Sequence, residues 1–143
     1  MSKYQIDTSE WAEINGDWQN IRIRTQNTKN PVMLFVHGGP GLCDRHAVLK
    51  SQSGLSDTFT MVMWDQRGSG KSFHQEKEKQ IYTVETYIED TVKMIEYLCE
   101  KFQQEKIIVT GHSWGSVLAV EAAVKCPERI AAYIGVGQFV DGV

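Results

Sequence analysis

Short apolar runs, separated by glycine, proline and polar residues, predict where strands lie along the chain. Residues 9–25 predict a β-hairpin, because two strand-like stretches flank Asn15-Gly16, a dipeptide suited to a tight turn. In the second stretch Ile21 and Ile23 alternate with arginines, as expected of a half-buried strand. Four further apolar runs predict strands, the first and the last of them buried: 32–37, 59–64, 106–112 and 130–140.

The segments between these strands predict helices. Residues 83–102 place apolar side chains at helical spacing along one stripe, with Thr83 as the N-cap. Residues 114–126 predict a second helix that ends near Pro127, and residues 44–57 predict a short one. After the hairpin, strands and helices therefore alternate. This order predicts an α/β fold, with a mostly parallel sheet and helices on both faces, and ligands bind such sheets at the carboxyl ends of the strands.

Composition narrows the class of protein. The 143 residues fit one domain, with 41% hydrophobic and 23% charged residues and a net charge of only −3. No basic stripe is present, so we expect no nucleic-acid partner. No run reaches the roughly 20 apolar residues of a membrane span, and no apolar signal segment opens the chain, so we expect a cytoplasmic protein without a membrane partner. The three cysteines form no C-x-x-C pair, and no metal site is expected.

The strongest chemical signal is the G-x-S-x-G pentapeptide Gly111–Gly115, with Ser113 at its centre. A predicted strand ends at His112 and a predicted helix begins at Trp114, which is the strand–turn–helix context of a nucleophile elbow. The glycines let neighbouring backbones approach a sharp turn, and the helix N-terminus favours developing negative charge. We therefore interpret Ser113 as a catalytic nucleophile rather than as an incidental serine in a glycine-rich turn.

The second signal is the glycine-rich loop His37–Gly41, which follows the first apolar run. An oxyanion hole needs backbone N–H groups aimed at the developing charge, and we expect them to come from Gly39 and Trp114. Alone, the loop is equally well interpreted as an ordinary tight turn, but the presence of Ser113 favours the catalytic role. We expect His37 to hold the loop by hydrogen bonds and not to act as the base. The residues assigned to the supporting loops are His37, Gly38, Pro40 and His112.

A third stretch, residues 64–72, ends in Gly-Ser-Gly-Lys-Ser and faintly suggests a phosphate-binding loop. The full phosphate-loop pattern fails, because Asp65 stands where the first glycine is required, so no nucleotide site is expected. We expect Asp65 and Arg67 to form local hydrogen bonds that brace the loops around Ser113.

Together the motifs HGGPG at 37–41, WDQRGSGKS at 64–72 and GHSWGS at 111–116 resemble the α/β-hydrolase superfamily. More narrowly they resemble its proline iminopeptidase (prolyl aminopeptidase) branch, whose amino-terminal half matches residues 9–140. The resemblance implies that Ser113 is the nucleophile and that the amides of Gly39 and Trp114 form the oxyanion hole. It implies substrates that are short peptides with an amino-terminal proline, or other small amides and esters. It implies no metal or organic cofactor.

The sequence departs from that family's pattern after the nucleophile. In this fold a catalytic acid and then a histidine follow the serine, but no histidine follows His112. The acids beyond Ser113 are Glu121, Glu128 and Asp141. We therefore expect residues 1–143 to be the amino-terminal part of a single α/β-hydrolase domain, truncated after the sixth strand and lacking the cap. Neither His46 nor His74 is expected to replace the base, and the loss of a triad member lowers the rate by about 10⁴-fold.

Three interpretations of function remain open from the sequence. The first is a serine hydrolase of aminopeptidase type, incomplete in this chain. The second is a catalytically inactive α/β-hydrolase-like fragment or binding domain, and the third is an esterase or lyase that uses the same elbow. Truncation would leave the strand at 130–140 as an unprotected edge. We expect that edge to self-associate or to pair with the missing carboxy-terminal half.

Overall fold

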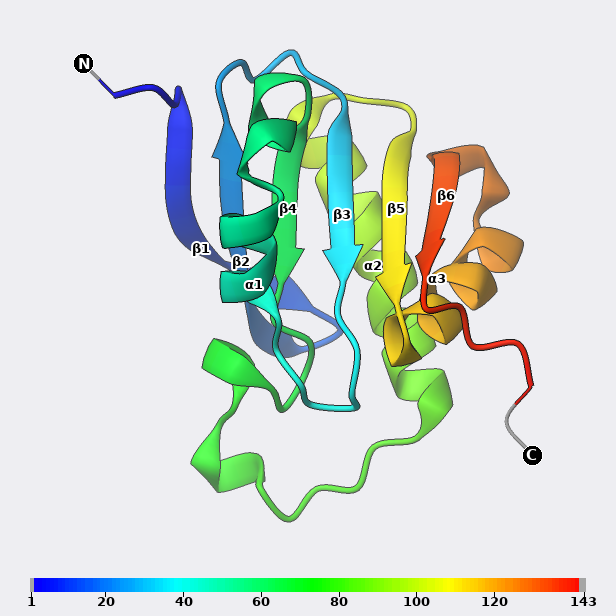
Figure 1. Ribbon diagram of the computed structural model, residues 1–143. Helices are drawn as coiled ribbons and strands as arrows, with labels where there is room; N and C mark the ends of the chain where they lie inside the picture. The colour runs from blue at the N-terminus through cyan, green and yellow to red at the C-terminus, as the bar shows by residue number, and fades with distance from the viewer. Residues whose placement is uncertain (1, 142–143) are drawn as a thin grey trace.

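The computed structural model describes residues 2–141, so residues 1 and 142–143 of the predicted domain lie outside the described part. One sheet contains six strands (Figure 1): β1 (Ile6–Ile14), β2 (Asp17–Thr25), β3 (Val32–Val36), β4 (Thr60–Trp64), β5 (Ile107–His112) and β6 (Ile130–Val136). The α-helices of this part are α1 (Arg45–Ser51), α2 (Val84–Phe102) and α3 (Trp114–Lys125). Within residues 2–141, no helix combines the length and apolar character that crossing a membrane requires.

The order of the strands places β3 inside the sheet, between β4 and β5. The sheet runs β1-β2-β4-β3-β5-β6, with β1 and β2 antiparallel to their neighbours and the other strands parallel. The chain moves from β3 to β4 on one side and then returns to β5 on the other. The carboxyl ends of β3 and β5 are therefore neighbours, with Val36 opposite Gly111. This reversal is the position at which open α/β sheets bind ligands.

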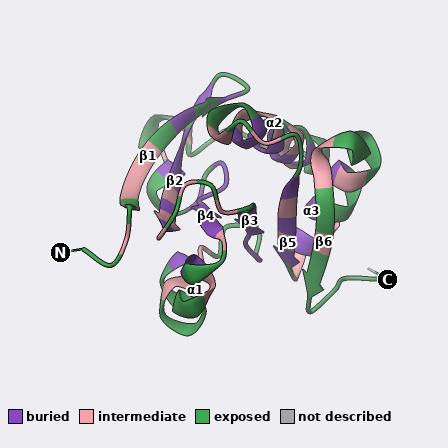
Figure 2. Ribbon diagram, turned by 90° about the horizontal axis from the view of Figure 1, so that it is seen from above, coloured by how far each residue is buried: buried purple, intermediate pink, exposed green. Residues whose placement is uncertain are grey.

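Helices cover the two faces of the sheet unequally. In Figures 1 and 2, α2 and α3 lie on one face, whereas α1 lies on the other. Alternate residues of β3 pack in opposite directions: Leu34 joins the core under α2 and α3, and Phe35 joins a smaller cluster near α1. Both faces of β3 and β4 are thus buried, which explains why their sequences are apolar throughout.

Most of the predicted elements are confirmed. Thr83 caps α2, since its side-chain oxygen accepts a hydrogen bond from the Thr86 amide at 3.3 Å. The helix predicted at 44–57 is wrong in its length, because α1 ends at Ser51 and a separate 3₁₀ turn covers Ser53–Asp57. Serines and Gly54 in this stretch weaken a continuous α-helix.

The prediction of a buried strand at 130–140 is also wrong. β6 ends at Val136, and its side chains are mostly exposed, with Ile134 at 42% and Val136 at 48% (Figure 2). The physical reason is its position, because β6 is the last strand of the sheet. A groove of about 470 Å³ lies beside it on the α1 face, and its lining includes Phe35, Val48 and Ile134. The apolar sequence of β6 predicted that the strand is buried, but within residues 2–141 no element packs over β6 on the face that carries this groove.

Candidate active site

Ser113 occupies a sharp turn between β5 and α3. Its backbone angles are φ 51° and ψ −117°, a region that non-glycine residues rarely adopt. Such a conformation costs on the order of 1–3 kcal/mol and persists only where neighbouring structure enforces it. Here the Ser113 amide donates to Val136 O at 2.9 Å, and Ser113 O accepts from the amide of Ser116 at 2.9 Å. The serine is therefore held by its backbone, and its side chain is partly exposed.

The two glycines of the pentapeptide are required by close backbone contacts. A Cβ on Gly111 would lie 2.6 Å from Gly115 O. A Cβ on Gly115 would lie 2.0 Å from Val36 O and 2.7 Å from His37 O. Real side chains do not tolerate such distances, so α3 approaches the end of β3 only because residue 115 has no side chain.

The glycine-rich loop after β3 lies against the turn that carries Ser113. Gly38 is buried, and a Cβ there would lie 3.4 Å from the Cβ of Ser113 and 3.3 Å from His112 O. Gly39 follows with φ +125°, a conformation that favours glycine, and is exposed together with Pro40. The loop and the turn at Ser113 are thus brought together, while the role of Ser113 as a nucleophile and the donation of the Gly39 and Trp114 amides to an oxyanion stay predictions.

His37 is a buried histidine whose ring nitrogens both have partners. Nδ1 lies 2.8 Å from Gly38 O, and Nε2 accepts from the Gln66 amide at 3.1 Å. Because a carbonyl only accepts and an amide N–H only donates, the proton resides on Nδ1. Burial lowers the pKa of His37, although the bond to Gly38 O opposes that shift. These contacts hold the ring of His37 between the loop after β3 and the loop after β4.

Gln66, which no sequence pattern indicated, joins the loop after β3 to the start of α3. Its side-chain Nε2 donates to His37 O at 2.8 Å, and its Oε1 accepts from the Trp114 indole N–H at 3.3 Å. Ser69, another residue of the same stretch, donates its hydroxyl to Gln66 O at 2.7 Å. The only available signal was position, since Gln66 follows a buried strand at the functional edge of the sheet.

Asp65 and Arg67 form the bracing bonds that the sequence predicted. Asp65 is buried, pairs with Arg45 at 3.0 Å and accepts from the Lys71 amide at 2.9 Å. The Cys43 thiol also donates to Asp65 at 2.8 Å. Burial raises the pKa of Cys43 to about 11, and the bond to Asp65 acts in the same direction. Cys43 is consequently a protonated thiol at neutral pH and is not activated as a thiolate.

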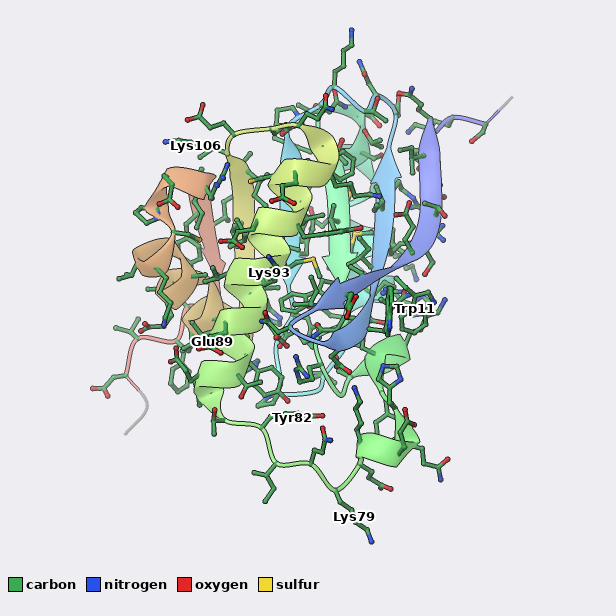
Figure 3. The ribbon with its side chains drawn as sticks, turned by 180° about the vertical axis from the view of Figure 1, so that it is seen from behind. Trp11, Lys79, Tyr82, Glu89, Lys93 and Lys106 are labelled. Carbon is green, nitrogen blue, oxygen red and sulfur yellow. The ribbon has the colours of Figure 1, made fainter. Side chains whose placement is uncertain are left out.

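Arg67 connects the loop after β4 to helix α2. Its guanidinium makes two hydrogen bonds to Asp90, at 2.7 and 2.9 Å, and both side chains are buried. Gln19 donates to the same carboxylate at 2.8 Å. The Tyr82 ring centroid lies 5.3 Å from the Arg67 guanidinium carbon, and Tyr82 is labelled in Figure 3 where the chain leads into α2. This network fixes the 64–72 stretch beneath the site.

Three of the four histidines have polar partners other than the Ser113 hydroxyl. His37 bonds as described, His46 is exposed on α1, and His74 contacts Trp18 O at 2.8 Å. His112 directly precedes Ser113, but its Nδ1 lies 3.5 Å from an Asp44 carboxylate oxygen. In the described part of the chain, none of these contacts orients an imidazole toward Ser113.

Comparisons with known proteins found a matching family and similar sequences. The profile of a family described as alpha/beta hydrolase fold matches residues 31–141. YbaC, a probable aminopeptidase of Bacillus subtilis, is 37% identical over 97% of this chain and 44% of its own length. A proline iminopeptidase of Lactobacillus helveticus is 31% identical over 69% of this chain and 32% of its own length.

A solved structure extends the comparison to the backbone. The proline iminopeptidase-related protein of Thermus thermophilus superposes with a TM-score of 0.75 at 24% identity. The superposition covers 96% of this chain and 46% of that protein, and it shows a shared fold. The chain thus spans less than half the length of each of these proteins.

Proposed function

The chain belongs to the α/β-hydrolase family, and on that premise we propose that it carries the nucleophile half of a serine hydrolase of aminopeptidase type. Its substrates would be short peptides with an amino-terminal proline, or other small amides and esters. The observation that carries this proposal is the strained Ser113, held between two glycines that cannot bear a Cβ. Relatives with the names probable aminopeptidase and proline iminopeptidase support the choice of reaction.

In the proposed reaction the Ser113 hydroxyl attacks the substrate carbonyl. The carbonyl oxygen becomes negatively charged and would accept hydrogen bonds from the amides of Gly39 and Trp114. The N-terminus of α3, which begins at Trp114, adds a favourable electrostatic field. A general base must take the Ser113 proton and later return it to the leaving group, and the described residues place no histidine there.

A second candidate function follows from that missing base. We propose as the alternative a catalytically inactive α/β-hydrolase-like fragment or binding domain. The specific observation in its favour is that His37, His74 and His112 each have other partners. Without a base, a serine hydrolase retains only the contributions of the oxyanion hole and of binding, about 10⁴-fold below the complete enzyme.

Reaction with a fluorophosphonate probe separates these functions. The probe traps a serine that lies beside an oxyanion hole, and peptide mapping identifies which serine has reacted. We expect slow but selective modification of Ser113, accelerated by added imidazole, which supplies the missing base. Ser113→Ala should abolish the modification, whereas Ser53→Ala, at an exposed serine of the 3₁₀ turn, should leave it unchanged. Failure of the folded chain to react at Ser113, with or without imidazole, supports the inactive binding domain.

We also propose that β6 is an association surface. Its outer edge presents unpaired backbone groups, and its residues carry no charge. Such an edge pairs readily with another strand. The partner is a second copy of this chain or the carboxy-terminal half of a hydrolase domain.

A further inference from the structure

Gln66 lies at the carboxyl end of the sheet, immediately beyond β4, and its side chain is almost completely buried, at 1% exposure. Its polar atoms contact three groups on two other residues, His37 and Trp114. The backbone N–H donates to His37 Nε2, the side-chain N–H₂ donates to His37 O, and the side-chain oxygen accepts from the Trp114 indole. One residue therefore contacts the loop after β3 and the first residue of α3.

The chemistry of these partners fixes the orientation of the Gln66 amide. His37 O can only accept a hydrogen bond, and an indole N–H can only donate one. Nε2 must therefore face His37 and Oε1 must face Trp114, with heavy-atom distances of 2.8 and 3.3 Å. A carboxylate at this position would face the His37 carbonyl with an acceptor, and an apolar side chain would leave that carbonyl without its donor.

We propose that Gln66 is a positioning residue that sets the separation of the two halves of the oxyanion hole. One half is the Gly38-Gly39 segment, which follows directly from His37, and the other is the backbone N–H of Trp114. This inference rests on the proposed serine hydrolase function. Oxyanion donors stabilise a transition state in proportion to their preorganisation, so a bridge between the donor segments acts on the reaction without touching substrate.

The surrounding contacts make this bridge stiff. His37 is held at both ring nitrogens, and Ser69 bonds to the Gln66 carbonyl through both its hydroxyl and its amide, at 2.7 and 2.9 Å. The Trp114 ring also packs edge-on against Tyr87, with centroids 5.9 Å apart. A shift of the Gln66 side-chain amide would therefore move both the glycine-rich loop and the start of α3.

The test uses Gln66→Glu, because a glutamate changes its hydrogen bonding with pH. When protonated, its carboxyl can donate to His37 O and accept from the Trp114 indole, as the amide does. When ionised, it can only accept. The measured quantity is the rate of Ser113 modification by a fluorophosphonate, in the presence of imidazole, as a ratio of wild type to variant across pH. We expect a ratio near one at acidic pH that rises to about tenfold or more at neutral pH.

Two further variants serve as controls. Gln66→Met, which removes both side-chain bonds, should give a reduced rate whose ratio to wild type does not change with pH. Gln75→Glu, at an exposed glutamine of a 3₁₀ turn, should give a ratio of one throughout. A pH-independent ratio near one for both Gln66→Glu and Gln66→Met would overturn the proposal.

A spectroscopic measurement keeps this test separate from the proposed function. The amide resonances of Gly39 and Trp114, and the Trp114 indole resonance, are followed by NMR in the wild type and in Gln66→Met. If Gln66 positions both segments, all three resonances should shift in Gln66→Met. A shift of the Trp114 indole resonance alone would mean that Gln66 affects only its direct partner, and it would overturn the proposal. If Ser113 of the wild type does not react at all, the hydrolase function fails, and these resonances alone decide whether Gln66 couples the two segments.

Discussion

At the scale of single residues, the turn that carries Ser113 depends on the absence of side chains at Gly111 and Gly115. Gly115 is the clearest case, since a Cβ there would lie 2.0 Å from Val36 O, a backbone atom that cannot rotate away. We expect Gly115→Ala to lower the free energy of unfolding by at least about 3 kcal/mol, or to prevent folding. Gly54→Ala, at a glycine with open space around it, should change stability by less than about 1 kcal/mol. Urea unfolding followed by circular dichroism compares the two, and equal losses would contradict this account of the turn.

His37 gives a prediction about pH. Its pKa is lowered from the ordinary value of 6.5 because it is buried. Below that pH the unfolded chain binds a proton that the folded protein does not, so this group's contribution to stability falls as pH decreases through about 6.5. In His37→Gln, overall stability should be lower, but this part of the pH dependence should disappear. Urea unfolding at several pH values measures how the free energy of unfolding changes with pH. The same change in His37→Gln as in the wild type would argue against this role of His37.

The residues of the site differ in how far sequence could reveal them. Ser113 was identifiable because its neighbours, a strand and a helix, are adjacent in the chain. Gln66 was not, because its partners His37 and Trp114 lie 29 and 48 positions away. Asp44, which pairs with His112, was missed for the same reason. Pairings over such separations are determined by the order of strands in the sheet and leave no local pattern.

At the scale of elements, the buried Arg67–Asp90 pair joins the loop after β4 to α2. Removal of Asp90 takes away both short hydrogen bonds of the buried Arg67 guanidinium and leaves it the longer contact to Asp17, at 3.5 Å, so most of the compensation for its buried charge is lost. We therefore expect Asp90→Ala to lower the free energy of unfolding by about 3–5 kcal/mol. The control is Glu96→Ala on the same helix, since Glu96 pairs at 3.4 Å with Lys93, which is labelled in Figure 3, and both side chains are exposed. That change should cost less than about 1 kcal/mol. Chemical denaturation measures both, and similar losses would show that the buried pair has no special role.

The elements themselves were largely predictable, because each has a local signature. The stripe and N-cap of α2 and the Asn15-Gly16 turn of the hairpin are visible within a few residues. The exposure of β6 was not visible, since an apolar strand looks the same whether or not a neighbour covers it. Burial is a property of the assembled sheet, and the residues of one strand do not specify it.

At the scale of the whole molecule, the two edges of the sheet differ in charge. β1 carries three acidic residues, Asp7, Glu10 and Glu13, whereas β6 carries none. Charged side chains on an edge strand oppose pairing with other chains. We therefore expect association through β6 and not through β1.

Light scattering over a range of protein concentrations tests this expectation. The chain should associate, and Ile134→Lys, which places a charge on β6, should raise the concentration at mid-association by about tenfold or more. Val124→Lys makes the same change at an exposed position of α3 and should have little effect. A monomer at all concentrations would exclude self-association and leave a carboxy-terminal half as the partner.

The turn at Ser113 has a consequence beyond the serine it holds. The contacts that enforce its angles reach only the backbone of residue 113: its amide donates to Val136 O, and its carbonyl accepts from the amide and the hydroxyl of Ser116. None of these contacts involves the side-chain hydroxyl of Ser113. The scaffold is therefore indifferent to which reactive group it displays, and a thiol or a carboxylate of similar size would be presented at the same point in space. Exchange of one side chain could redirect the chemistry while the architecture around it stays intact.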